Sequence, residues 1–353
     1  MADETPSFDG FACPVPINRY PQILLAHGGG GKLTHELIEQ VFVTAFRNDD
    51  LAPMHDGAML TVGGERIAFT TDSYVVHPLF FPGGSIGDLA VCGTVNDLAM
   101  CGARPRYLSA AFVIEEGLPV TDLQRIAADM RRAADRAGVT LVTGDTKVVD
   151  RGKGDGVFIT TAGIGIIPAG IDIRPTRMQA GDVLIVNGPI AQHGIAIMSV
   201  REGLSFATQI VSDTAPLNSL VDEMLQACPS THVLRDPTRG GLATTLNELA
   251  SQSGTGIELE ETAIPVDDEV RGACEILGFD PLYVANEGKL IAAVPAAAAD
   301  AVLAAMRAHP LGTRAAVIGK VVTDHPAMVT MRSSIGSMRV VDMLSGEQLP
   351  RIC

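Results

Sequence analysis

The sequence contains no tryptophan, and aromatic residues make up only 4% of its 353 residues. Its cores must therefore be aliphatic, and the stacking platforms that bind single-stranded nucleic acid are not expected. Positive charge is also scarce, because 26 Lys and Arg residues stand against 41 Asp and Glu residues and leave a net charge of -15. This charge repels a phosphate backbone, whose binding depends on cationic side chains. Nucleic acid is therefore excluded as a main partner, whereas a nucleotide carried with Mg²⁺ is not.

Long apolar runs and paired cysteines are missing as well. The most apolar stretch, residues 290–306, contains Pro295 and Asp300 and falls short of a membrane span. The first four residues include two acidic ones where a signal peptide would be basic, so we expect a cytoplasmic protein with no membrane partner. None of the six cysteines belongs to a C-x-x-C pair, which is typical of zinc and thiol redox sites. One of them, Cys353, is the last residue.

The length predicts about two domains, because 353 residues exceed the usual size of one hydrophobic core. Residues 1–22 are rich in proline and lack periodicity, which predicts a flexible N-terminal extension. A segment rich in Pro, Gly and Arg interrupts the strand and helix patterns near Pro168. We predict an N-terminal domain over 23–168, a C-terminal α/β domain over 169–340 and a mobile tail over 341–353. Mixed strands and helices in both halves indicate an α+β (mixed α/β) fold rather than one doubly wound sheet.

Five aspartates follow strands, lie in glycine-rich turns or interrupt a helix of small residues. They are Asp56, Asp72, Asp97, Asp145 and Asp236. Mg²⁺ prefers several oxygen ligands on rigid backbone and usually bridges to substrate phosphates, which such a set could supply. Each aspartate taken alone is more often a cap or turn residue. Asp97 is the exception, because an unpaired carboxylate in an apolar helix is costly.

Two glycine-rich segments are candidate phosphate-binding sites. Residues 28–32, Gly-Gly-Gly-Gly-Lys, offer backbone N–H groups and a lysine, but they match neither a Walker A loop nor a dinucleotide fingerprint. A flexible hinge is the alternative interpretation of this segment. The second segment, Gly240-Gly241, begins a predicted helix whose N-terminus could hold an anion.

Three further segments carry reactive side chains. Lys147 follows Asp145 in a predicted Gly-Asp-Thr-Lys turn, where an amine could lie beside phosphate oxygens; a surface lysine is the alternative. Glu287 lies in Asn-Glu-Gly-Lys between two apolar runs, and by spacing alone this segment predicts only a hairpin turn. The chain ends in Leu-Pro-Arg-Ile-Cys, and Pro350 keeps this end extended. The tail could therefore bring Cys353 into an active site.

Together these segments resemble the HypE carbamoyl dehydratases of hydrogenase maturation. That family belongs to the PurM-like superfamily, with aminoimidazole ribonucleotide synthetase, selenophosphate synthetase and thiamine-monophosphate kinase. The resemblance runs from about His27 to Cys353. The segment Asn96-Asp97-Leu98-Ala99 and the loop at Lys32 are shared across the superfamily. The segments specific to the family are 143–149, 236–241, 286–288 and 350–353.

The resemblance implies a two-domain PurM-like fold and a homodimer whose N-terminal sheets pair across the interface, with ATP and Mg²⁺ bound nearby. It implies that HypF loads a carbamoyl group onto the thiol of Cys353, and that this chain dehydrates the group to a thiocyanate with ATP. The HypC and HypD complex would then accept the cyanide for the iron of the [NiFe] centre.

The resemblance also leads us to assign roles to individual residues. The expected metal ligands are Asp56, Asp72, Asp97, Asp145 and Asp236. The expected nucleotide-binding residues are Gly30, Gly31, Lys32, Asp72, Asn96, Asp97, Asp145, Arg239 and Gly240, with Lys32 near the terminal phosphate. Cys353 would carry the substrate, Lys147 would stabilise charge on the phosphoryl group or carbamoyl oxygen, and Glu287 would position or deprotonate the carbamoyl nitrogen.

Two other classes of function remain open. Another PurM-like ATP-dependent enzyme, such as a selenophosphate synthetase or a small-molecule kinase, would share the aspartates but would not need a terminal cysteine. A non-catalytic carrier would need Cys353 but not the aspartates. The sequence contains both features, which favours an enzyme that acts on its own tail.

Overall fold

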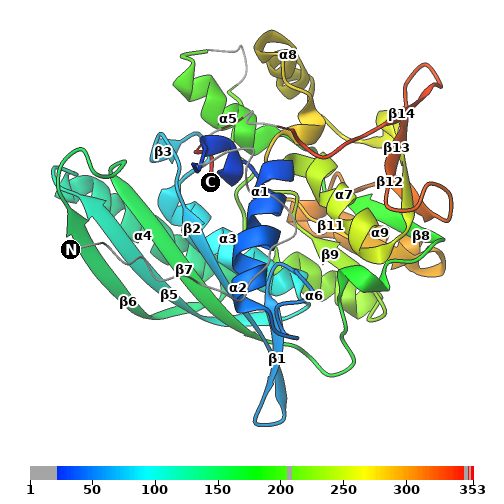
Figure 1. Cartoon of the computed structure of the whole chain (residues 1–353), viewed down its shortest axis with the longest axis horizontal. Coiled ribbons are helices and arrows are strands. Elements are labelled where there is room, and N and C mark those ends of the chain that lie inside the picture. The colour runs from blue at the N-terminus through cyan, green and yellow to red at the C-terminus, as the bar shows by residue number, and fades with distance from the viewer. Residues whose placement is uncertain (1–21, 205–208, 346–348, 350) are drawn as a thin grey trace, which may run out of the picture.

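A computed structural model of the chain describes residues 22–204, 209–345, 349 and 351–353. The predicted N-terminal extension, except for its last residue, lies outside the described residues. Two large β-sheets organise the rest, and helices pack against both (Figure 1). Strands and helices alternate in both halves, so the predicted mixed α/β fold is confirmed.

The first sheet has the strand order β1-β2-β7-β5-β6, and the second has the order β14-β13-β10-β12-β8-β11-β9. The strands are β1 (Ala58–Val62), β2 (Glu65–Tyr74), β3 (Phe80–Phe81), β4 (Gly84–Ser85), β5 (Arg104–Glu115), β6 (Thr140–Val149), β7 (Val157–Ile166), β8 (Asp182–Val186), β9 (Val233–Arg235), β10 (Gly256–Glu260), β11 (Ile291–Pro295), β12 (Ala316–Val322), β13 (Val329–Arg332) and β14 (Met338–Val340). The helices are α1 (Lys32–Leu37), α2 (Thr44–Phe46), α3 (Ile86–Met100), α4 (Val120–Ala137), α5 (Gln192–Arg201), α6 (Asn218–Ala227), α7 (Gly241–Ser253), α8 (Asp268–Leu277) and α9 (Ala299–Ala308).

Helix α3 packs on one face of the first sheet, and α4 packs against α3. A capping box fixes the start of α3, because the Ser85 hydroxyl accepts from Gly87 N (3.2 Å) and Asp88 accepts from Ser85 N (3.1 Å). The helix is apolar almost all round, which suits a helix buried on every side. Helix α4 is amphipathic instead and ends at Gly138 in the left-handed conformation.

The other face of the first sheet carries an exposed apolar row. Phe69 and Tyr107 both pair with Ile164 across the strand ladders, which puts the three side chains side by side. They are 42%, 54% and 40% exposed, respectively. A sheet face of this kind usually meets another surface.

The central strands β8 and β11 of the second sheet are buried on both faces, as expected for strands without polar alternation. Leu184 and Val186 of β8 face a core formed with α5, α7 and α8, whereas Ile185 faces a core formed with α6 and α9. The second of these cores also includes Leu98 and Met100 of α3, so α3 joins the two sheets. Among the described residues, no helix is both long and apolar enough to cross a bilayer.

Two local predictions are wrong. The predicted turn at Gly144 and Asp145 is part of the continuous strand β6, which pairs in parallel with β5. Gly144 allows β6 to approach β5 closely, because a Cβ at this position would overlap Ala110 O. The segment at Glu287 is not a hairpin turn either, since a 3-10 turn (Pro281–Tyr283) precedes it and only β11 after it is a strand.

Candidate active site

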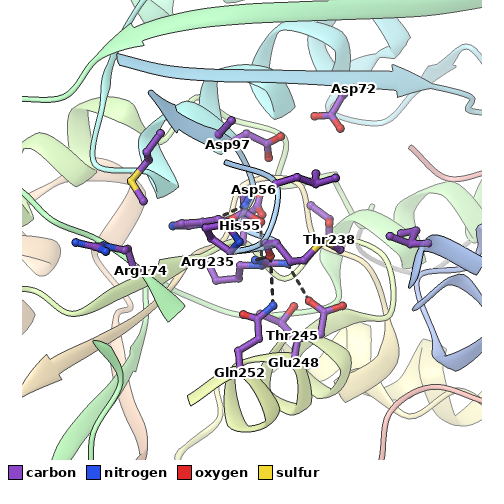
Figure 2. Close-up of a pocket in the computed structure, with 18 of the residues that line it drawn as sticks. His55, Asp56, Asp72, Asp97, Arg174, Arg235, Thr238, Thr245, Glu248 and Gln252 are labelled. Carbon is purple, nitrogen blue, oxygen red and sulfur yellow. Dashed lines mark hydrogen bonds and ion pairs between the residues drawn. The ribbon is translucent and has the colours of Figure 1, made fainter. Parts of the chain in front are cut away.

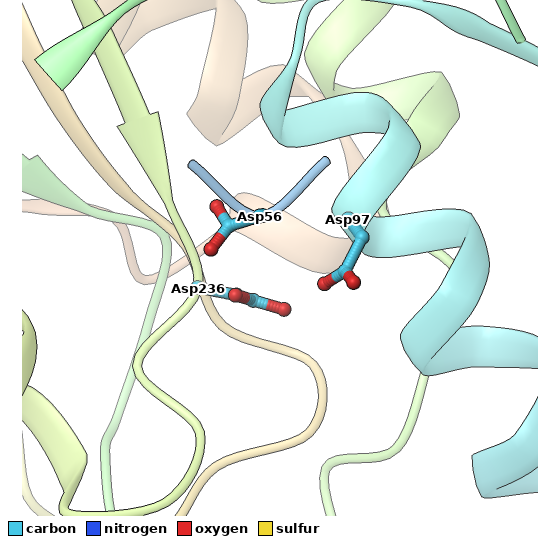
Figure 3. Close-up of side chains that lie close together, drawn as sticks. All are labelled: Asp56, Asp97 and Asp236. Carbon is cyan, nitrogen blue, oxygen red and sulfur yellow. The ribbon is translucent and has the colours of Figure 1, made fainter. Parts of the chain in front are cut away.

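Three aspartates from three separate elements converge between the two sheets (Figure 3). Asp97 comes from α3, Asp236 directly follows β9, and Asp56 precedes β1. Their carboxylate oxygens lie within 4.8 Å of one another, and we call these three residues the acid cluster. Asp56 Oδ2 is buried and has no hydrogen-bond partner among the described residues.

The cluster holds more negative charge than its neighbours neutralise. Burial and the surrounding carboxylates raise the pKa of Asp97 and of Asp236 well above the usual value. Arg235 offers partial compensation, with Nε 2.8 Å from Asp56 Oδ1 and a second ion pair to Glu248 at 2.9 Å. A compact set of hard oxygen donors with an unpartnered oxygen fits Mg²⁺.

A cavity of about 600 Å³ opens beside the acid cluster, and we call it the large cavity. Its volume is typical of small-molecule sites. Figure 2 shows Thr245, Glu248 and Gln252 rising from α7 on one side, with Asp97 and Asp72 on the opposite side.

The two predicted phosphate segments contact each other, but only the first, residues 28–32, lines the large cavity. Gly30 and Gly31 both line it. Gly30 has a φ of 78°, and a Cβ there would lie 2.6 Å from the Cβ of Arg239. Gly240 caps the start of α7 with a φ of 78°, and a Cβ there would lie 3.0 Å from Gly30 O. Lys32 points elsewhere, because it forms an ion pair with Asp342 at 2.6 Å and does not line the cavity.

The thiol of Cys353 lies in a second, small cavity of about 50 Å³. Asp72, Asp97, Asp236, Thr238 and Arg239 line both cavities. The small cavity also contains Ser73, Tyr74, Gly93 and Glu287. The acid cluster therefore stands between the terminal thiol and a space that could hold a nucleotide.

The surroundings of the small cavity raise the pKa of both the Cys353 thiol and the Glu287 carboxyl. Burial raises the pKa of the Cys353 thiol to about 12, Arg239 opposes this shift, and the Glu287 carboxyl adds to it. Burial and the carboxylates of Asp236 and Asp213 raise the pKa of Glu287 well above its usual value. Glu287 Oε1 has no hydrogen-bond partner among the described residues. A carboxyl group with a raised pKa is suited to exchanging a proton near neutral pH.

Buried hydrogen bonds hold the backbone of Glu287 in place. Asn96 donates from Nδ2 to Glu287 O (3.2 Å) and to Ala215 O (3.1 Å). Asp213 accepts from Glu287 N (3.2 Å) and forms an ion pair with Lys289 at 3.0 Å. Asn96 therefore positions Glu287 through its backbone. It lines neither cavity.

Asp145 and Lys147 lie away from both cavities. They are exposed on β6 and pair with each other at 2.6 Å. Sequence reasoning missed Arg235, Glu248 and other side chains that surround Asp56. A detectable signal for some of them was the spacing of Thr245, Glu248 and Gln252, which puts three polar side chains on one face of the helix.

Family models match most of the chain. Residues 54–167 match the N-terminal domain of AIR synthase related proteins, and residues 179–331 match their C-terminal domain. A curated relative, carbamoyl dehydratase HypE of Cupriavidus necator, is 56% identical over 98% of both chains.

Solved structures agree with this relationship. A structure described as a HypE-HypF complex aligns with a TM-score of 0.84 and 47% identity over 87% of this chain and 99% of that chain. A structure described as HypE in complex with ATP aligns with a TM-score of 0.80 and 49% identity over 94% of this chain and 100% of that chain. By sequence and by fold, the chain belongs to the HypE family of carbamoyl dehydratases, within the AIR synthase related, PurM-like group.

Proposed function

We propose that this chain uses ATP to dehydrate an S-carbamoyl group on its own Cys353 to a thiocyanate, which donates cyanide in [NiFe] hydrogenase maturation. The observation that carries the proposal is the small cavity, in which the terminal thiol, Glu287 and two members of the acid cluster lie together. The relatives support it, because the curated relative is named a carbamoyl dehydratase and one solved relative is described in complex with ATP.

The reaction needs a better leaving group than an amide oxygen. The carbamoyl oxygen attacks the terminal phosphorus of ATP, and the bond between that phosphorus and ADP breaks. The carbon–oxygen bond then breaks with loss of phosphate, while the nitrogen gives up both of its protons and S–C≡N remains. One proton leaves with phosphate and one passes to a base, so the carbamoyl group and ATP yield thiocyanate, ADP and phosphate.

The residues of the small cavity suit these steps. Glu287, with its raised pKa and unpartnered oxygen, takes a proton from the carbamoyl nitrogen. Arg239 lies beside the thiol and stabilises negative charge on the oxygen during transfer. Asp56, Asp97 and Asp236 would hold Mg²⁺, with Asp72 beside them, and the ion when bound neutralises phosphate charge.

The partners of the reaction follow from the same proposal. HypF supplies the carbamoyl group. The relative described as a HypE-HypF complex supports this choice of partner. The HypC and HypD complex accepts the cyanide. A second copy of this chain packs on the open face of the first sheet, where Phe69, Tyr107 and Ile164 are exposed. In this arrangement Asp145 and Lys147 reach the site of the partner subunit.

The two alternative functions fit the geometry less well. A selenophosphate synthetase or small-molecule kinase would have no use for a half-buried thiol beside the acid cluster. A non-catalytic carrier would need an accessible thiol and no acid cluster. Neither alternative accounts for a small cavity that contains both features.

Mass spectrometry of the C-terminal peptide tests the proposal. After incubation with HypF, carbamoyl phosphate and Mg-ATP, the peptide should first gain a carbamoyl group and then lose one water. Cys353→Ala is the control, which should bind ATP normally and gain neither group. A cyano group on another residue, or a carbamoylated peptide that persists while ATP is consumed, would overturn it.

A further inference from the structure

The last residues of the chain occupy a binding site of their own. Val75 N donates to Cys353 O at 3.0 Å, and His77 N donates to Arg351 O at 3.1 Å. These two bonds flank an antiparallel bridge between Val76 and Ile352. Figure 1 marks the C-terminus near β3 and α5, far from the second sheet's last strand. The tail thus binds by strand addition, the main-chain mode that many proteins use to bind separate peptides.

His193 fixes the position of this added strand. It lies in α5, is fully buried, and its Nε2 is 2.6 Å from Ile352 O. A carbonyl only accepts, so Nε2 must carry the proton and Nδ1 must accept. Ser212 Oγ lies 2.8 Å from Nδ1 and donates to it. Burial lowers the pKa of His193, which agrees with this neutral ring.

Two side chains of the tail are also recognised. Ile352 is 3% exposed and lies in the apolar cluster that includes Val76, Phe81 and Ile197. Arg351 points the other way and pairs with Asp155 at 2.6 Å. The site therefore distinguishes an apolar residue before the terminal cysteine and a cation before that.

We propose that Val75, Val76, His77, Asp155 and His193 form a C-terminal peptide-binding site, the tail-binding site, which accepts a separate S-carbamoylated peptide ending in Arg-Ile-Cys. The hydrogen bonds, the apolar contact and the ion pair that hold the tail all involve groups that a free peptide also has. The covalent link to the chain then acts only by raising the local concentration of the tail. His193 is the positioning residue of the site. The inference extends the proposed function, because it names a second form of the same substrate.

A variant that lacks residues 349–353 tests the inference, since it leaves the tail-binding site free. The probe is the peptide Leu-Pro-Arg-Ile-Cys, S-carbamoylated by cyanate, whose carbon takes the thiol sulfur and whose nitrogen takes the proton. With Mg-ATP the peptide should lose one water at a rate that saturates with its concentration. The matched peptide Leu-Pro-Arg-Asp-Cys should have a KM ~10-fold higher or more, because it would bury a carboxylate.

Variants of His193 separate positioning from a structural role. His193→Leu removes the donor to the Ile352 carbonyl and should raise the KM for the peptide ~10-fold, with kcat and ATP affinity little changed. His193→Gln restores a donor and should recover most of the loss. If the leucine variant uses the peptide as well as the parent does, or if glutamine gives no recovery, the role of His193 is wrong.

Binding is measured separately from chemistry so that the two proposals fail independently. Fluorescence anisotropy of a labelled, unmodified Leu-Pro-Arg-Ile-Cys peptide should show saturable binding to the truncated protein. Binding without conversion of either the peptide or full-length Cys353 would refute the proposed function and support the tail-binding site. No binding, with full-length Cys353 converted, would overturn the site. If the truncated protein does not fold, full-length Ile352→Asp, whose tail cannot bury, replaces it.

Discussion

The single residue Asp97 explains why the site should bind a cation. Its carboxylate lies on an apolar helix, with oxygens of Asp56 and Asp236 within 4.8 Å. The Thr70 hydroxyl donates to it at 2.8 Å, but one neutral donor does not offset burial and two nearby carboxylates. The raised pKa of Asp97 records the unfavourable free energy of its charge in the metal-free protein.

We expect Asp97→Asn to stabilise the metal-free protein while removing its response to Mg-ATP. The amide keeps the shape and can still accept from Thr70, but it carries no charge. The free energy of unfolding should rise by about 1 kcal/mol or more, because the change removes a buried charge that lies beside two other carboxylates. Scanning calorimetry with and without Mg-ATP measures both effects.

Glu275→Gln, on the exposed side of α8, is the control for this change. It removes one negative charge far from the acid cluster and should alter the free energy of unfolding by less than about 0.5 kcal/mol. Its stabilisation by Mg-ATP should be unchanged. Full stabilisation of Asp97→Asn by Mg-ATP would contradict the assignment of Asp97 to the metal.

Strand β6 carries two predicted site residues, Asp145 and Lys147, that lie outside both cavities. Lys147 pairs with Val113 and Asp145 with Ala111 in the ladder to β5, which puts both on the face that carries Tyr107. Their ion pair is exposed, and such pairs contribute little to stability. A functional role for Lys147 thus depends on a second copy that covers this face.

Mixing two inactive variants tests whether Lys147 acts across the dimer interface. Lys147→Ala and Cys353→Ala should each be inactive as homodimers. In a mixed dimer, Cys353 of one chain would meet Lys147 of the other, so one site becomes complete. Random exchange of subunits should then restore about a quarter of the dehydration measured for the parent.

The matched control mixes Glu287→Gln with Cys353→Ala. The structure places Glu287 and Cys353 of one chain in the same small cavity. Every mixed dimer would therefore lack one of the two in each site, and activity should stay far below that of the first mixture, because each chain's own tail fills its tail-binding site. Equal recovery in this control, or no recovery in the first mixture, would contradict the arrangement.

Local sequence patterns are sufficient for elements that depend on neighbours in sequence. The hairpin of β1 and β2 and the capped start of α3 are of this kind, because turn residues and caps act within a few positions. Strand β6 was mispredicted because Gly144 and Asp145 favour turns locally, while pairing with β5 prevails in the fold. The Glu287 loop depends on Asn96 and Asp213, whose contacts no local pattern reveals.

The candidate site was predictable to a similar extent. Asp97 stood out because its charge contradicts its helix, and Asp56 and Asp236 do join it. Nothing in the sequence indicated that Asp145 lies on an exposed strand, since this depends on the register of β6. His193 had no ligand spacing around it, and its partner Ile352 is distant in the sequence.

At the scale of the whole molecule, the two ends of the described chain meet at the site. The glycine loop is held by Lys32 N, which donates to Leu344 O at 3.0 Å. Val341, Leu344 and Ile352 are buried, so much of the predicted tail packs against the protein in this structure, and its mobility stays a prediction. The fold thus surrounds Cys353 with segments from both halves of the chain.

Buried thiols make the free energy of unfolding of the whole molecule depend on pH. Burial raises the pKa of Cys92 and of Cys274 from 9.0 to about 12. Between these values the unfolded chain releases protons that the folded chain keeps. The folded state then binds more protons, so the free energy of unfolding falls as pH rises. Each thiol should contribute a fall of about 1.4 kcal/mol per pH unit above 9.

Urea unfolding under reducing conditions, repeated from neutral pH into the alkaline range, should therefore show stability that declines above pH 9. Cys92→Ala provides the control, because Cys92 belongs to α3, lies fully buried in the core, and its thiol is the group removed. This variant should be less stable at neutral pH by about 1 kcal/mol, since it leaves a small cavity. Its stability should nevertheless decline less steeply than that of the parent, because one proton fewer is released on unfolding. A parallel decline in both proteins would show that Cys92 does not contribute, and a flat profile would show that the buried thiols ionise as readily in the folded chain as in the unfolded one.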